Sequence, residues 1–123
     1  MPPLYSYLYV EDDPLSREVM QTLLVEVMGV KNLTIFEDSH NFMARLKTIS
    51  PPPDFILLDI HIMPHDGYEL LSELRSDPEY ARCKVLAVTA AVMTKEVEEL
   101  KARGFDGAFA RDEIARRQWR PED

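Results

Sequence analysis

Residues 55–67 read FILLDIHIMPHDG, and the architecture of the chain follows from this stretch. Four apolar residues, Phe55–Leu58, run directly into the carboxylate of Asp59. A short continuous apolar run is typical of a parallel strand that is buried on both of its faces. Because burying an unpaired carboxylate at the end of such a strand is costly, Asp59 is expected to have a partner that offsets its charge.

Four other short runs resemble Phe55–Leu58 and are predicted to be strands. They are Tyr5–Val10, Asn32–Phe36, Val85–Val88 and Gly107–Ala110. Between the runs, apolar residues recur every three or four positions, which is typical of helices with one buried face. Phe42, Leu46 and Ile49 form one such series, and a last short helix is predicted from about residue 112 to residue 119.

Strict alternation of strands and helices implies a parallel sheet, since each parallel strand is reached through a crossover helix. Right-handed crossovers then place helices on both faces of the sheet. The predicted fold class is therefore α/β, with a five-stranded, doubly wound parallel sheet. Asp13 and Pro14 predict where the first helix begins, because the carboxylate can cap the helix and proline suits its first turn.

The length and composition limit the organisation of the chain. Its 123 residues, of which 46% are hydrophobic, are expected to form one compact domain over residues 1–123, with a flexible tail at residues 120–123. No apolar run approaches the roughly 20 residues needed to span a bilayer, and the N-terminus lacks the features of a signal peptide. The single cysteine, Cys83, excludes an internal disulfide and suits a reducing cytoplasm.

The charge of the chain argues against a nucleic-acid partner. The chain carries 22 acidic and 14 basic residues, a net charge of −8, whereas nucleic-acid binding requires clustered cations. The only basic cluster in the sequence is Arg116–Arg120, which is interpreted as a solvated helix end rather than a binding patch. The sequence therefore predicts neither a nucleic-acid nor a membrane partner.

Polar side chains follow every predicted strand, at the edge where parallel strands end. Glu37 and Asp38 after the second strand are interpreted as a helix cap, and the side chains after the other four strands are candidates for a site. They are Glu11, Asp12 and Asp13 after the first strand, Asp59 after the third, Thr89 after the fourth and Arg111 after the fifth. In open parallel sheets, ligands bind beyond this edge. Crowded carboxylates repel one another unless a cation joins them, and an all-oxygen site suits Mg²⁺. Thr89 and Arg111 are suitable donors for an anion such as a phosphoryl group, and a carboxylate such as Asp59 can act as its nucleophile.

At these residues the sequence resembles the CheY-like receiver domain of bacterial two-component response regulators. Four segments carry the resemblance in the order and spacing of the family: YLYVEDDPLSRE at residues 7–18, ILLDIHIMPHDGYELL at 56–71, VLAVTA at 85–90 and ARGFDGAFAR at 102–111. The resemblance implies a flavodoxin-like fold for nearly the whole chain and a single receiver domain without an output domain.

The resemblance also implies a metal site. In the pattern of the family, Glu11 and Asp12 form the acidic pair that binds Mg²⁺ together with Asp59. The backbone carbonyl of His61 is implied to complete the ligands that the protein provides. Asp13 is implied to cap the first helix instead of binding the ion.

The implied function is that of a single-domain response regulator. Asp59 would accept a phosphoryl group from a phosphohistidine of a sensor histidine kinase or a histidine phosphotransfer protein, and Thr89 would be the switch hydroxyl. The phosphorylated form would then signal by binding a downstream protein in the cytoplasm. The resemblance implies no enzyme activity beyond phosphorylation and dephosphorylation of the chain itself. Because receivers often pair through their last helices, a homodimer is left open.

Three positions depart from the pattern of the family. Arg111 stands where the family usually has a lysine, and Ala108 stands where it usually has an aromatic residue on the fifth strand. Pro64 follows Asp59 by five residues instead of the usual four, whereas Gly67 keeps its place. These departures concern the switching mechanism more than the fold.

Two alternative functions remain at this stage. The first is a pseudo-receiver, a protein-interaction module that works without phosphorylation, which Arg111 and Ala108 favour and the intact carboxylates oppose. The second is a phosphatase similar to the haloacid dehalogenases. Such an enzyme needs a second aspartate two residues after the nucleophile, where this chain has His61.

Overall fold

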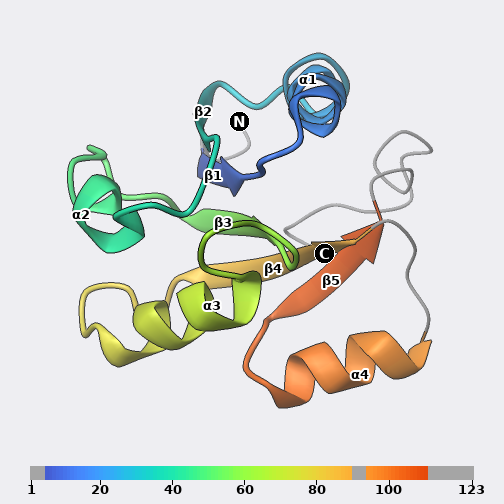
Figure 1. Cartoon of the computed structure of the whole chain (residues 1–123). Coiled ribbons are helices and arrows are strands. Elements are labelled where there is room, and N and C mark those ends of the chain that lie inside the picture. Colours follow the sequence, from blue (N-terminus) through green and yellow to red (C-terminus); the bar gives the residue numbers. More distant parts are fainter. Residues whose placement is uncertain (1–4, 90–93, 111–123) are drawn as a thin grey trace.

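The structure is a computed structural model that describes residues 5–89 and 94–110. In this part of the chain, five strands form one sheet (Figure 1). The strands are β1 (Ser6–Val10), β2 (Asn32–Phe36), β3 (Phe55–Asp59), β4 (Lys84–Thr89) and β5 (Gly107–Ala110). Neighbouring strands are parallel, and their order is β2-β1-β3-β4-β5. The predicted strands are confirmed, each to within one residue at either end.

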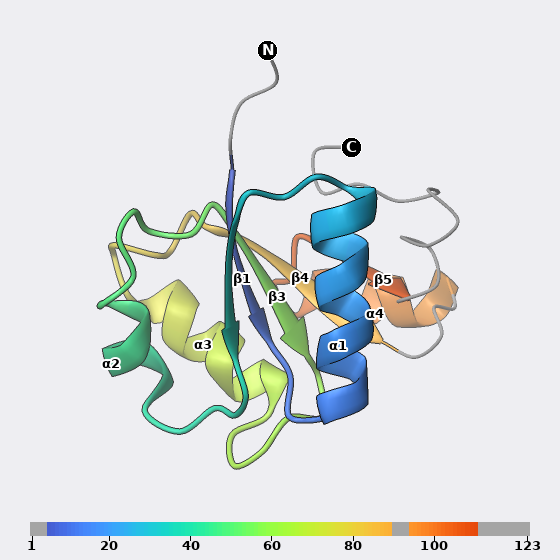
Figure 2. The same ribbon diagram turned by 90° about the horizontal axis from the view of Figure 1, so that it is seen from above.

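Helices cover both faces of the sheet, as predicted for a doubly wound fold (Figures 1 and 2). On one face lies α1 (Pro14–Thr22), which continues into a π-helical segment, η1 (Leu23–Val27). On the other face lie α2 (Phe42–Leu46), α3 (Gly67–Ser76) and α4 (Thr94–Ala102). No helix in the described ranges is long and apolar enough to cross a membrane. The helix predicted near residues 112–119 and the tail at 120–123 lie outside the described residues.

Each face of the sheet carries its own hydrophobic core, because successive side chains of a strand point to opposite faces. Leu8 and Leu58 belong to the core beneath α2, α3 and α4. Tyr9 and Leu57 belong to the core beneath α1, together with Met20 of that helix. Strand β3 lies at the centre of the sheet and is buried along its whole length. This position explains why its first four residues are all apolar.

The second predicted helix is shorter than its apolar spacing suggested. The series Phe42, Leu46 and Ile49 predicts a helix of at least two turns, but α2 ends at Leu46. Beyond it, the amides of Thr48 and Ile49 donate to the carbonyls of Arg45 and Leu46 at 3.1 Å, which is turn geometry rather than α-helix. The three consecutive prolines that follow have no amide hydrogen to donate, so the helix cannot resume there.

The first helix begins where the sequence predicts, directly after the acidic residues that follow β1. The amide of Ser16 donates to Oδ2 of Asp13 at 2.8 Å, and Pro14 occupies the first helical position. Asp13 therefore caps α1, as the resemblance implied. The two acidic residues before it, Glu11 and Asp12, lie between the end of the strand and the start of the helix.

Candidate metal centre

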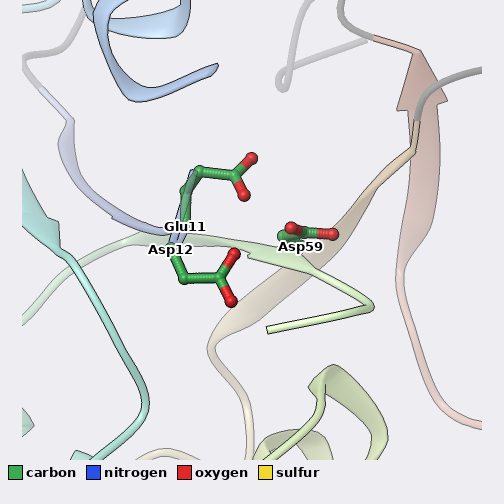
Figure 3. Close-up of side chains that lie close together, drawn as sticks. All are labelled: Glu11, Asp12 and Asp59. Carbon is green, nitrogen blue, oxygen red and sulfur yellow. The ribbon is translucent and has the colours of Figure 1, made fainter. Parts of the chain in front are cut away.

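Three carboxylates meet at the edge where β1 and β3 end. Glu11 and Asp12 follow β1 directly, and Asp59 is the last residue of β3. The two strands are neighbours with Val10 opposite Leu58, so their ends lie side by side. One ligand atom from each carboxylate lies within 4.8 Å of the others, and the carboxylates of Glu11 and Asp12 are directed toward Asp59 (Figure 3). The structure thus brings together the three side chains that were predicted to bind a metal.

The spacing and chemistry of this cluster fit Mg²⁺. Glu11 is 1% exposed and Asp59 is 9% exposed, whereas Asp12 is the most exposed of the three. Carboxylates this close and this buried repel one another unless a cation or a proton joins them. Mg²⁺ takes oxygen ligands at about 2.0–2.1 Å in octahedral geometry, so two of its ligands lie about 3 Å apart when they are neighbours and about 4 Å apart when they are opposite. The three carboxylates therefore need only a small adjustment to reach one ion.

Glu11 accepts hydrogen bonds at both carboxylate oxygens and at its backbone carbonyl. The phenol of Tyr9 donates to Oε1 at 2.7 Å, and the amide of Asp13 lies 3.4 Å from Oε2. Nη1 of Arg17 donates to the carbonyl of Glu11 at 3.0 Å. The sequence prediction did not include Tyr9 or Arg17. Strand alternation could have indicated Tyr9, because residues 9 and 11 project to the same face, whereas the contact of Arg17 depends on how α1 packs.

Asp59 is tied to the loop that follows it. The amide of His61 donates to Oδ1 of Asp59 at 3.1 Å. The amide of Gly67 donates to the carbonyl of Ile60 at 3.0 Å, which closes the loop at the start of α3. The predicted role of the His61 carbonyl as a metal ligand stays a prediction.

The loop after β2 makes hydrogen bonds to the segment around Pro64, where the sequence departs from the pattern of the family. Ser39, in the loop after β2, is fully buried. Its amide donates to the carbonyl of Met63 at 3.1 Å, and its hydroxyl accepts from the amide of His65 at 2.7 Å. The sequence prediction did not include Ser39, because a polar residue between a strand and a helix is normally solvated. Hydrogen bonds to Ser39 thus hold the loop on both sides of Pro64, at Met63 and at His65.

Gly67→Ala is expected to lower the free energy of unfolding by about 1–3 kcal/mol, as other overpacking substitutions do. A Cβ at this position would lie 3.0 Å from Cα of Ile60 and 3.1 Å from the carbonyl oxygen of Asp59. Both are backbone atoms, so the chain beside the carboxylate cluster would have to shift. Urea unfolding measures the effect, with Ser72→Ala on the exposed face of α3 as the neutral control. Equal stability of Gly67→Ala and the wild type would contradict this packing.

Thr89 lies at the same edge as the three carboxylates. It is the last residue of β4 and follows Val88, which lies opposite Asp59 in the sheet. Its hydroxyl donates to the carbonyl of Phe109 on β5 at 3.5 Å. Arg111 lies outside the described residues, so its predicted role stays a prediction.

The free cysteine lies away from this centre. Cys83 precedes β4, whereas the carboxylates lie at the edge where the strands end. Burial raises the pKa of the Cys83 thiol to about 11, so the thiol stays protonated near neutral pH. A protonated thiol is a poor nucleophile and a poor metal ligand. Cys83 is therefore a packing residue.

The sequence of this chain is similar to those of response regulators. The model of the response regulator receiver domain family matches residues 7–116. The probable C4-dicarboxylate response regulator DctR of Halalkalibacterium halodurans is 30% identical over 102 residues, which cover 83% of this chain and 43% of that protein. Stress response regulator protein 1 of Meyerozyma guilliermondii is 26% identical over 107 residues, 87% of this chain and 49% of that protein. The chain thus spans about half the length of these relatives.

A solved structure with the same fold contains a divalent ion. The Mn²⁺-bound form of response regulator Rcp1 superposes with a TM-score of 0.71 at 26% sequence identity. The match covers 86% of this chain and 80% of that one.

Proposed function

This chain belongs to the response regulator receiver domain family, and from that membership we propose that it is a phosphorylation-dependent signalling domain. Asp59 accepts the phosphoryl group, and the phosphorylated form binds a downstream protein. The donor is a phosphohistidine of a histidine kinase or a phosphotransfer protein, the partners of receiver domains. The observation that carries the proposal is the convergence of Glu11, Asp12 and Asp59 on one point beyond β1 and β3.

The proposal includes a divalent ion, Mg²⁺. Glu11, Asp12 and Asp59 would hold it, and the carbonyl of His61 would add a fourth ligand. Bound there, the ion offsets the negative charge that gathers on the oxygens of the transferred phosphoryl group. The Mn²⁺-bound form of the similar Rcp1 structure supports a divalent ion as a ligand of this chain.

The transfer step forms one bond and breaks another. A carboxylate oxygen of Asp59 attacks the phosphorus while the bond from phosphorus to the imidazole nitrogen of the donor breaks. The electron pair of that bond stays on the nitrogen, which leaves a neutral imidazole when the other ring nitrogen carries a proton. The hydrogen bond from the amide of His61 to Oδ1 of Asp59 fixes the orientation of the attacking carboxylate.

Phosphorylation acts as a signal through Thr89. Its hydroxyl donates to the carbonyl of Phe109 at 3.5 Å, which is a long hydrogen bond to a neutral acceptor. A phosphoryl oxygen on Asp59 is charged and is therefore the stronger acceptor. The hydroxyl leaves β5 for the phosphoryl group, and Arg111 supplies a positive charge to the same group. The partner protein must bind the two arrangements with different affinity for a signal to result.

Incubation with acetyl phosphate and Mg²⁺ tests the proposal. The intact mass of the wild type is expected to rise by one phosphoryl group, and Asp59→Asn is expected to show no increase because the nucleophile is gone. Asp66→Asn is the matched control: Asp66 caps α3 in the same loop, and asparagine caps helices equally well. Asp66→Asn should therefore be phosphorylated like the wild type.

Two results would contradict the proposal. The first is a wild type that gains no phosphoryl group from acetyl phosphate or from histidine kinases of the same organism. This result would favour the pseudo-receiver that Ala108 and Arg111 suggest. A phosphoryl group that persists in Asp59→Asn would place the acceptor elsewhere.

A further inference from the structure

One tyrosine contacts the metal centre from inside the hydrophobic core. The phenol of Tyr9 donates to Oε1 of Glu11 at 2.7 Å, and this hydrogen bond is buried. Tyr9 is 0% exposed and Glu11 is 1% exposed. From this geometry we infer that Tyr9 is a positioning residue, which fixes the Glu11 carboxylate in the orientation that a divalent ion requires. The inference rests on the proposed function, because it assigns a residue that supports the same Mg²⁺ site.

The hydroxyl of Tyr9 has a fixed position. Tyr9 is the fourth of the five residues of β1 and lies opposite Ile35 of β2 and Leu57 of β3. Its ring belongs to the core beneath α1, which also contains Met20 and Leu24. A tyrosine ring packed in a core turns about only two side-chain bonds, so its hydroxyl is a rigid anchor. A glutamate side chain has one more rotatable bond than aspartate, so Glu11 needs such an anchor to keep one orientation.

Repulsion within the carboxylate cluster is the reason why Glu11 requires a hydrogen-bond partner that fixes its orientation. Glu11, Asp12 and Asp59 carry like charges within 4.8 Å, so repulsion favours rotation of each side chain away from the others. The hydrogen bond from Tyr9 opposes that rotation at the most buried of the three carboxylates. A hydrogen bond to a charged carboxylate is stronger than one between neutral groups, which suits it to this task.

The neutrality of the phenol is as important as its position. An arginine or lysine at this place would also hold Glu11, but its positive charge would repel an incoming divalent ion. Tyr9 stabilises the carboxylate and leaves the negative charge of the cluster available to the metal. Partners of this kind around metal ligands typically change metal affinity by 10–100-fold when they are removed.

The apolar alternative is that Tyr9 merely fills space in the core. A phenylalanine would fill the same space, and a buried hydroxyl without a partner is costly in an apolar core. The hydroxyl is placed at hydrogen-bond distance from a metal-ligand candidate. Tyr9→Phe separates the two roles, because it removes the hydroxyl and keeps the ring.

Calorimetric titration with Mg²⁺ tests the inference on three forms of the chain. Tyr9→Phe is expected to bind the ion about tenfold or more weakly than the wild type. The matched control is Tyr7→Phe, which removes the same atom from the same face of β1, two residues farther from Glu11. Tyr7 lies against Phe55, with ring centroids 5.1 Å apart, and its variant is expected to bind like the wild type. Thermal unfolding in EDTA reports any loss of stability separately from metal affinity.

Each outcome of the titration has one meaning. Equal affinity of Tyr9→Phe and the wild type would overturn the role of Tyr9 and leave the proposed function standing. An equal loss in both tyrosine variants would also overturn it, because strand packing would then be the cause. A wild type that binds no Mg²⁺ would defeat the metal site itself, and with it the proposed function.

A measurement on the wild type keeps the inference testable if Tyr9→Phe fails to fold. Binding of Mg²⁺ to Glu11 changes the acceptor of the Tyr9 hydrogen bond, so the ultraviolet absorption of a tyrosine should change during the titration. The same change is expected in Tyr7→Phe. Saturation with Mg²⁺ without a tyrosine difference spectrum would overturn the inference.

Discussion

Removal of Mg²⁺ with EDTA is expected to slow phosphorylation of Asp59 by acetyl phosphate at least about a hundredfold. The incoming phosphoryl group is negatively charged, and it must approach three carboxylates that lie within 4.8 Å of one another. A divalent ion at this point contributes several kcal/mol to stabilising the charge of the transition state, and each 1.36 kcal/mol changes the rate about tenfold. The rate of mass increase, with and without the chelator, measures the effect.

The control for this experiment is restoration of the ion. Excess Mg²⁺ added back to the chelated protein should restore the original rate. Asp12→Asn should remain slow at the same Mg²⁺ concentration, because Asp12 is a ligand candidate that does not itself accept the phosphoryl group. Equal rates with and without EDTA would contradict a metal-dependent transfer.

Leu57→Ala is expected to lower the free energy of unfolding by about 3–5 kcal/mol. Leu57 is fully buried in the central strand, between Tyr9 of β1 and Leu86 of β4. Truncation leaves a cavity beneath α1 in addition to the lost apolar contact, and both terms act in the same direction. Domains of this size are stable by only about 5–15 kcal/mol, so this loss is a large fraction of the total stability. The midpoint of urea unfolding measures the change.

Leu15→Ala is the matched control for the core substitution. It removes the same atoms from the first turn of α1, where Leu15 is 68% exposed. Alanine favours helices slightly more than leucine does, so the expected change is within about 0.5 kcal/mol. Similar losses in the two variants would contradict the assignment of Leu57 to the core.

The strands could be predicted because burial on both faces leaves a plain sequence signal. The run Phe55–Leu58 is apolar throughout, and strand β3 is buried throughout. The end of α2 was less predictable, because apolar spacing does not distinguish a helix from a turn that buries the same residue. The π-helical segment Leu23–Val27 was missed for a similar reason, since apolar spacing does not distinguish one wider turn from an α-helical turn.

The carboxylates of the site could be predicted because parallel strands all end at one edge of a sheet. That rule brings Glu11, Asp12 and Asp59 together without any knowledge of side-chain packing. Tyr9 was missed because a tyrosine within an apolar run is normally a core residue, and its hydroxyl contact depends on side-chain rotamers. Outside the site, the contacts of Arg75 also depend on side-chain rotamers and could not be predicted. Arg75 donates hydrogen bonds to Cys83, Gly104 and Asp106, which belong to segments far apart in the sequence.

Calorimetric titration of the wild type and Asp12→Asn with Mg²⁺ tests the central claim most directly. The carboxylate cluster predicts that the wild type binds a single ion at millimolar concentrations or below. Asp12→Asn should lose most of this affinity, whereas Asp66→Asn, which changes a helix cap outside the cluster, should keep it. A wild type that takes up no ion at millimolar Mg²⁺, or an Asp12→Asn variant that binds as tightly as the wild type, would contradict the account.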